Sequence, residues 1–207
     1  MTLADLPVRH PVRERRLAFN SGRVIRVRTD VVDLPGGDRV TRDVVEHPGA
    51  VGVIALDDAE RVLLVQQYRH AAGHLLWEPP AGLLDVSGED PLAAASRELA
   101  EEAGQAAVRW DVLVDAFTTP GMSNEAVRIY LARDLTVVER PPGEGEERDM
   151  PIRWVPLDEA VRAVFAGALH NPMAAIGLLA AQIARRDGFA LLRPAGADWP
   201  AWAAAKA

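Results

Sequence analysis

The sequence predicts an α/β or α+β sandwich that follows a small N-terminal antiparallel β-lobe. Segments of strand character come first, one strong helical segment interrupts them, and two further helical segments follow later in the chain. A hydrophobic fraction of 49% over 207 residues is large enough for a buried core. Because His47-Pro48-Gly49 breaks the chain, we expect a β-lobe over residues 1–47 and a second domain over residues 48–207.

The N-terminal lobe is predicted from a strand and a hairpin. Residues 23–28 (RVIRVR) alternate apolar and basic side chains, which is typical of a strand. Residues 29–34 and 40–45 flank the turn sequence Pro35-Gly36-Gly37-Asp38. We therefore expect these two segments to pair as an antiparallel hairpin.

The core strands of the second domain are predicted from short apolar runs. Residues 51–56 (VGVIAL) and 61–67 (RVLLVQQ) read as buried strands joined by a polar turn. Residues 75–78 are a candidate short strand, and residues 79–82 (PPAG) form a loop that is rigid at its prolines and permissive at its glycine.

Residues 91–103 form the clearest helical segment. Asp90 is suited to cap the N-terminus, Pro91 suits the first helical position, and Gly104 can adopt the left-handed conformation that ends a helix. At 100° per residue, one apolar stripe gathers the side chains of Leu92, Ala95, Leu99 and Ala103. We expect this stripe to face the core.

The rest of the chain is predicted to alternate strands and loops before it ends in helices. Residues 136–149 hold prolines, glycines and many acids, so we expect an acidic mobile loop there. The other expected elements are strands over 110–117, 126–132 and 152–155, a loop over 118–125, helices over 157–166 and 172–186, and an alanine-rich end over 195–207.

The overall charge and composition exclude several classes of function. The formal net charge of −7 disfavours a nucleic-acid polymer as partner, although an acidic protein can bind a small anion through metal ions or local arginines. The lack of cysteine excludes disulfides, thiolate metal sites and cysteine nucleophiles, and it fits a cytoplasmic protein. No apolar run approaches the roughly 18 residues of a membrane span, so we expect no membrane partner.

The helical segment 91–103 concentrates carboxylates at one place. Glu98 and Glu102 lie four residues apart and fall on one face, with Glu101 beside them. Like charges at this spacing repel each other, and anions are disfavoured near a helix C-terminus. Arg97 can pair with Glu101 but cannot neutralise three carboxylates. A locally unfavourable cluster of hard oxygen ligands indicates a site for Mg²⁺, with Mn²⁺ as the alternative; a solvated acidic face is the other interpretation.

Residues 82–104 (GLLDVSGEDPLAAASRELAEEAG) resemble the Nudix box, G-x5-E-x7-R-E-U-x-E-E-x-G-U, in which U is a bulky apolar residue. There are two departures from that pattern. Six residues instead of five precede the first glutamate, which a bulge beside Gly88 can absorb, and Gln105 holds the final apolar position. The matching positions are Gly82, Glu89, Arg97, Glu98, Leu99, Glu101, Glu102 and Gly104.

Three further segments are similar to the ADP-ribose pyrophosphatases of that family: residues 66–69 (QQYR), 77–82 (WEPPAG) and 119–125 (TPGMSNE). Pro120 follows Gly104 by sixteen residues, as a proline follows the box in that subgroup. The resemblance implies a Nudix-type α/β/α sandwich with a mixed sheet. It also implies metal-dependent hydrolysis of the diphosphate link of ADP-ribose, which yields AMP and ribose 5-phosphate.

The resemblance assigns the chemistry of the box by position. It implies that Glu98, Glu102 and the carbonyl of Ala81 are metal ligands and that Glu101 is a further ligand or holds one in place. Arg97 would orient the glutamates. Glu89 would serve as a water-mediated ligand, or it is simply an acid favourable to the first helical turn. The general base is expected in the acidic loop, at Glu146 or else at Glu147.

The substrate contacts implied by the resemblance lie outside the box. Arg69 suits the diphosphate, because a guanidinium matches phosphate oxygens, although a surface arginine is an equal alternative. Tyr68 and Trp77 are candidates for packing the adenine or ribose, or they belong to the core. The other implied substrate-binding residues are Glu78, Met122, Ser123 and Glu125, together with Arg26 and Arg28 acting toward the neighbouring subunit of a homodimer.

Two alternatives to ADP-ribose hydrolysis remain open at this point. One is a Nudix pyrophosphohydrolase for another nucleoside diphosphate derivative, such as a nucleotide sugar, NADH or a dinucleoside polyphosphate. The other is a protein that binds ADP-ribose as a sensor and lacks catalysis, which an eroded box would favour. The acidic positions of this box are intact, so we expect an enzyme with a small nucleoside diphosphate substrate.

Overall fold

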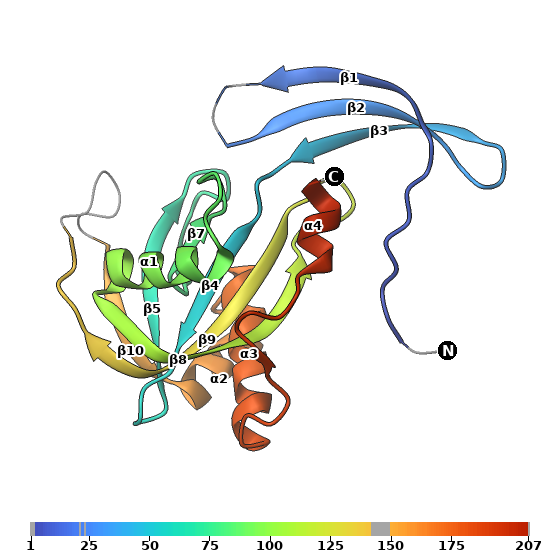
Figure 1. Cartoon of the computed structure of the whole chain (residues 1–207). Coiled ribbons are helices and arrows are strands. Elements are labelled where there is room, and N and C mark those ends of the chain that lie inside the picture. The colour runs from blue at the N-terminus through green and yellow to red at the C-terminus, as the bar shows by residue number, and fades with distance from the viewer. Residues whose placement is uncertain (1–2, 21, 23, 142–149, 207) are drawn as a thin grey trace. The chain divides into compact units, whose positions relative to one another are not determined.

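The computed structural model of the chain describes residues 3–20, 22, 24–141 and 150–206 (Figure 1). The chain divides into two compact units. The first unit contains Met1–Gly49, Phe117–Ala126 and Trp199–Ala207, and the second contains Ala50–Ala116 and Val127–Asp198.

A three-stranded antiparallel sheet forms most of the first unit. Its order is β1 (Val12–Asn20), β2 (Arg26–Asp33) and β3 (Arg39–Glu46), and the turn between β2 and β3 confirms the predicted hairpin. Two details differ from the prediction. The segments expected at 23–28 and 29–34 are represented by the single strand β2, and β1 has no counterpart in the expected elements.

Ion pairs hold the strands of this sheet together around a buried carboxylate. Asp30 on β2 is paired across the sheet with Arg15 on β1, whose Nε lies 3.0 Å from an Asp30 oxygen. Arg28 donates to the other Asp30 oxygen at 3.0 Å. Burial acts to raise the pKa of Asp30, but the hydrogen bonds from Arg15 and Arg28 outweigh it and the pKa is lowered.

The other two segments of the first unit are hydrogen-bonded to the chain break at residues 47–49. The His47 amide donates to the Asn124 side chain at 2.8 Å. From α4 (Pro200–Lys206), Trp202 donates its indole N–H to the Pro48 carbonyl at 3.0 Å, and the Ala205 carbonyl accepts from Asn124 at 2.9 Å. The break is therefore a fixed junction within this unit.

Two sheets form the framework of the second unit. A five-stranded mixed sheet has the order β11 (Arg193–Pro194), β8 (Gln105–Phe117), β9 (Ala126–Val137), β4 (Ala50–Ala55) and β7 (Ala81–Leu83). A three-stranded antiparallel sheet has the order β10 (Ile152–Pro156), β5 (Arg61–Arg69) and β6 (His74–Glu78). The pair β4 and β9 is parallel, which makes the larger sheet mixed as expected.

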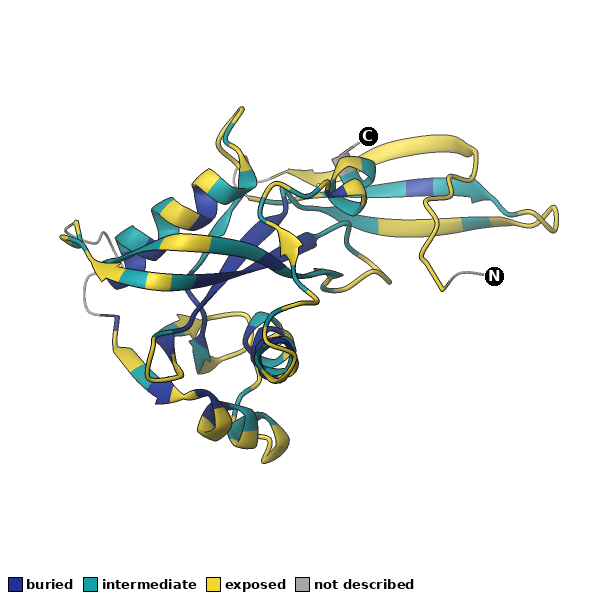
Figure 2. Ribbon diagram, turned by 60° about the horizontal axis from the view of Figure 1, so that its bottom comes forward, coloured by how far each residue is buried: buried dark blue, intermediate teal, exposed yellow. Residues whose placement is uncertain are grey.

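Helices cover both faces of this framework. In Figures 1 and 2, α1 (Pro91–Ala103) lies on one side of the strands, and α2 (Leu157–Phe165) and α3 (Pro172–Arg186) lie on the other. The mixed α+β architecture therefore agrees with the predicted fold class. In the described part of the chain, no helix has the length and apolar character needed to cross a membrane.

The ends of α1 confirm the predicted capping residues. The Asp90 side chain accepts from the Leu92 amide at 2.9 Å, and Gly104 has a φ of 61° that an L side chain rarely adopts. The buried face differs slightly from the expected stripe, because Ala94 and Glu102 are buried there while Leu92 is only half-buried. A carboxylate is therefore part of the face that α1 turns toward the strands.

Several strands have boundaries that differ from the predicted ones. Strand β8 begins at Gln105 and β9 extends to Val137, both beyond the apolar runs at 110–117 and 126–132. Residues 81–83 pair with β4 as β7, which overlaps the loop predicted over residues 79–82. Main-chain hydrogen bonds with neighbouring strands define these elements. Where the side chains are small or solvent-exposed, such strands show no apolar pattern in the sequence.

Close packing of α3 on β4 depends on Gly177. A β-carbon added there would lie 2.8 Å from Cγ1 and Cδ1 of the buried Ile54. Although alanine has the higher helix propensity by up to about 1 kcal/mol, we expect Gly177→Ala to lower the free energy of unfolding by about 1–2 kcal/mol because of overpacking. Denaturant titration measures this change. Gly36→Ala, where a β-carbon meets open space, is the control and should change it little.

Candidate active site

The acidic helix α1 and the strand β7 form the centre of the site. On α1, Glu98 and Glu102 are one turn apart, and both approach the short stretch of main chain at Ala81 and Gly82. Gly82 faces Glu98 so closely that an added β-carbon would lie 2.1 Å from its Oε1. Any larger residue at this position would force the Glu98 side chain to move.

Glu102 is tied to the same stretch of main chain. Its Oε2 accepts a hydrogen bond from the Ala81 amide at 2.9 Å, and the residue is only 6% exposed. A buried carboxylate at this position fixes β7 relative to the end of α1. The structure thus shows the Ala81 amide bound to the acidic helix, and the metal-ligand role of the Ala81 carbonyl stays a prediction.

Arg97 connects the remaining carboxylates of the box. Its Nε and Nη2 donate to Glu89 at 2.9 and 3.1 Å, and its Nη1 donates to Glu98 at 2.7 Å and to Glu101 at 2.9 Å. These contacts, led by the hydrogen bonds to Glu89, raise the pKa of Arg97, and the same hydrogen bonds lower the pKa of Glu89. One guanidinium thus bridges three carboxylates, and a net negative charge remains at the site.

The donor set fits a hard divalent cation. Oxygen atoms of Glu98 and Glu102 and the main chain beside Gly82 are the ligand type that Mg²⁺ and Mn²⁺ prefer. Among the described residues, no three carboxylate or imidazole side chains are already arranged as a metal site. In this structure, Glu98 accepts a hydrogen bond from the Arg97 side chain and Glu102 accepts one from the Ala81 amide. Rotation of the two glutamate side chains would break both hydrogen bonds.

Arg69 and Glu78 form a bidentate ion pair at the ends of β5 and β6. The Arg69 Nε and Nη2 donate to the two Glu78 oxygens at 2.9 and 2.5 Å. Glu78 is 1% exposed while the Arg69 side chain is 43% exposed. A buried carboxylate thus holds the plane of a solvent-facing guanidinium, which suits recognition of an anion.

Tyr68 and Trp77 lie on the other face of the same two strands. Side chains alternate between faces along a strand, so Trp77 points away from its neighbour Glu78. Trp77 packs against the core cluster that includes Leu64, Leu157 and Leu178 of β5, α2 and α3. The structure therefore does not bring Trp77 together with the α1 carboxylates, and Tyr68 is partly exposed at 44%.

Arg26 and Arg28 belong to the sheet of the first unit. Arg28 pairs with Asp30 and Glu46, and its side chain is 18% exposed. Arg26 is 63% exposed and lies 3.9 Å from Glu46. Arg28 is thus mainly engaged within its own sheet, whereas Arg26 faces solvent.

The loop of the first unit that carries Met122, Ser123 and Glu125 is held by local hydrogen bonds. Glu125 accepts from the Thr118 hydroxyl, and its amide donates to the Ser123 hydroxyl at 3.1 Å. His47 lies 3.5 Å from Glu125; it appeared in the sequence only as part of a chain break. Burial lowers the pKa of His47 while the charge of Glu125 acts to raise it. Met122 is exposed.

Glu146 and Glu147, the predicted general bases, lie outside the described residues.

Comparison with known proteins places the chain in a family. The model of the NUDIX domain matches residues 46–175. An ADP-ribose pyrophosphatase of Mycobacterium tuberculosis is 49% identical over 181 residues, which cover 87% of each chain. A methanol dehydrogenase activator of Bacillus methanolicus is 35% identical over 76% of this chain and 85% of its own length.

A solved structure has the same fold. The crystal structure of an ADP compounds hydrolase superposes with a TM-score of 0.68 and covers 90% of this chain and 100% of its own, at 19% identity. The domain match includes the whole acidic helix, its arginine and the glycine that receives Glu98. The resemblance read from residues 82–104 is thereby confirmed, and the chain belongs to the Nudix family of hydrolases.

Proposed function

We propose that this protein hydrolyses ADP-ribose to AMP and ribose 5-phosphate with Mg²⁺ as its metal ion. The 49% identity to an ADP-ribose pyrophosphatase, extending over 87% of the chain, is the observation that carries the proposal. The similarity extends over 181 residues, far more than the acidic helix alone, so it supports a substrate as well as the Nudix chemistry.

The proposed metal ligands are Glu98, Glu102 and the carbonyl of Ala81, with Glu101 and Glu89 nearby. A bound Mg²⁺ would offset the charge of the diphosphate and lower the pKa of the attacking water. Arg97 orients the glutamates, because its guanidinium reaches Glu89, Glu98 and Glu101 together. Water adds to one phosphorus, the bridging oxygen leaves with the other phosphate, and Glu146, or else Glu147, is proposed to take the proton.

Substrate contacts are proposed for Arg69 and for residues of the first unit. Glu78 holds the Arg69 guanidinium in one plane, so the arginine meets the diphosphate with little loss of side-chain freedom. Ser123, Met122 and Glu125 are proposed to contact the terminal ribose. For Tyr68 and Trp77, a stacking role has less support, because they lie across the sheet from Glu78.

A homodimer is part of the proposal, and the exposed strand β1 supports it. All nine of its residues are exposed, including the apolar side chains of Leu17 and Phe19. Such a strand is suited to pairing or packing with a second copy, and Arg26 and Arg28 are proposed to act toward the site of that copy. We also propose a cytoplasmic location, because the proposed substrate is a nucleotide metabolite. Sedimentation at twice the mass of one chain would support the dimer.

The substrate is tested with a panel. With Mg²⁺, the purified protein should release AMP and ribose 5-phosphate from ADP-ribose faster than it hydrolyses ADP-glucose, NADH or diadenosine polyphosphates, as followed by chromatography. Faster hydrolysis of another compound would retain the Nudix chemistry and refute ADP-ribose as the substrate. Tight ADP-ribose binding without turnover of any compound would identify a sensor.

Glu102→Gln tests the metal assignment. Glutamine retains the shape and still offers an oxygen to the Ala81 amide, but it removes one ligand charge. We expect Mg²⁺-dependent turnover to fall by about 100-fold or more with the melting temperature nearly unchanged. Glu60→Gln, at a 62% exposed side chain paired with Arg185, is the control and should keep its activity. Undiminished turnover by Glu102→Gln would exclude Glu102 as an essential ligand.

Gly82→Ala tests the close approach of the main chain to Glu98. The added methyl group would occupy the position of the Glu98 carboxylate, so that side chain must move. We expect kcat for ADP-ribose to fall by about 10-fold to 100-fold, since small misplacements of ligands are costly in catalysis. Gly196→Ala, where a β-carbon meets open space, is the matched control. Equal activity of the two variants would contradict the assignment.

A further inference from the structure

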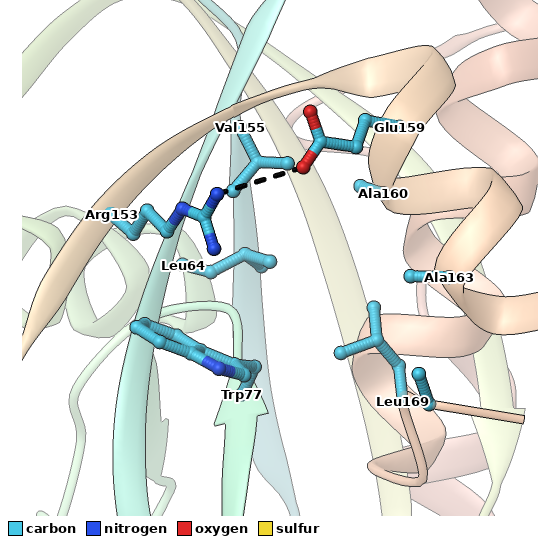
Figure 3. A pocket seen from close by; sticks show the side chains of 9 residues that line it. Leu64, Trp77, Arg153, Val155, Glu159, Ala160, Ala163 and Leu169 are labelled. Carbon is cyan, nitrogen blue, oxygen red and sulfur yellow. Dashed lines mark ion pairs between the residues drawn. The ribbon is translucent and has the colours of Figure 1, made fainter.

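A cavity of about 250 Å³ lies in the second unit between β5, β6, β10 and the helix α2 (Figure 3). Aliphatic side chains form most of its wall, an indole ring forms one side, and an ion pair lies at its rim. The residues that line it are Leu64, Trp77, Arg153, Val155, Glu159, Ala160, Ala163, Ala168 and Leu169.

This cavity is separate from the acidic helix. Leu64, Trp77 and Val155 belong to the strand face that packs on α2 and α3. Glu78, the next residue after Trp77, points to the opposite face and binds Arg69. The sheet β10-β5-β6 therefore lies between the cavity and the face that carries the Arg69–Glu78 pair, and an occupant of the cavity would not be the diphosphate.

The apolar part of the cavity suits one large hydrophobic side chain. A dry cavity of about 150 Å³ lined by aliphatic and aromatic groups accepts benzene, so about 250 Å³ accommodates a phenyl or indole group with its methylene. Trp77 offers a ring face for an offset or edge-to-face contact. Ala160 and Ala163 of α2 keep the space open where longer side chains would fill it.

The rim of the cavity presents one cation and one anion side by side. In Figure 3, the side chains of Arg153 and Glu159 point toward one another, and their Nη2 and Oε1 atoms are 3.6 Å apart. Both are well exposed, at 60% and 50%, so their mutual attraction contributes little to stability. A ligand with its own carboxylate and ammonium would replace this loose pair with two opposite-charge contacts.

We propose that this cavity binds a free α-amino acid with a large apolar side chain. The side chain enters the cavity beside Trp77, the α-carboxylate pairs with Arg153, and the α-ammonium pairs with Glu159. A purely anionic ligand would meet repulsion from Glu159, and a purely cationic one would meet repulsion from Arg153. The zwitterion is the charge pattern that satisfies both rim residues, and the cavity volume selects phenylalanine-sized side chains.

The ligand chemistry is tested by saturation-transfer NMR and calorimetry with L-phenylalanine. We expect a dissociation constant on the order of a millimolar, as befits a ligand of this size. Glycine lacks the side chain, 3-phenylpropionate lacks the ammonium, and phenethylamine lacks the carboxylate. Each should bind about 5-fold to 10-fold more weakly or not at all. Equal binding of 3-phenylpropionate or phenethylamine would overturn the zwitterion assignment.

The location is tested with variants. Ala163→Leu fills the cavity and Arg153→Gln removes the cation, so both should weaken L-phenylalanine binding about 5-fold or more while thermal unfolding remains cooperative. Arg109→Gln is the matched control, because Arg109 is 57% exposed and lies 3.5 Å from Asp134 in a similarly loose pair. Saturating ADP-ribose should not displace L-phenylalanine. Lack of binding by the wild-type protein, unaltered binding by both cavity variants, or displacement by ADP-ribose would refute the site.

Discussion

The contact of Arg97 with three carboxylates is the interaction on which the site depends. Glu89 precedes α1, whereas Glu98 and Glu101 belong to it, and all three hydrogen-bond to one guanidinium. Without that cation, the acids near the helix C-terminus would repel one another and oppose the macrodipole. The arrangement retains negative charge that a divalent cation can compensate. Arg97 thus reduces the repulsion that destabilises the helix, and the remaining negative charge is available to bind the proposed metal ion.

The alternation of side chains along β6 divides the second unit into two chemical environments. Glu78 points to one face, where it is buried and holds Arg69. Trp77 points to the other face, where it meets the apolar cluster of α2 and α3. Trp77 and Glu78 are consecutive residues of β6. A ligand beside Trp77 and an anion beside Arg69 would therefore lie on opposite faces of the same strand pair. The two proposed binding sites are therefore distinct, although the same strands separate them.

The positions of residues that depend on helix geometry were predictable from the sequence. The positions of residues that depend on the register of paired strands were not. Asp90, Gly104 and the spacing of Arg97 to the glutamates follow from helix geometry alone. The separation of Trp77 from Glu78 requires the register of β5 with β6, which the turn between them decides. Strand β1 escaped prediction because it is exposed on both faces and lacks an alternating pattern.

The acidic helix alone does not identify a substrate. Its carboxylates and arginine address the metal ion and the diphosphate, which any nucleoside diphosphate derivative presents. One relative is an ADP-ribose pyrophosphatase and another is a methanol dehydrogenase activator, so family membership leaves room for different roles. Discrimination must come from groups that meet the terminal ribose or the base, and a site that hydrogen-bonds a substrate hydroxyl rejects analogues that lack it. Identity over 181 residues, well beyond the acidic helix, is therefore the stronger argument for ADP-ribose, because such contacts would arise outside that helix.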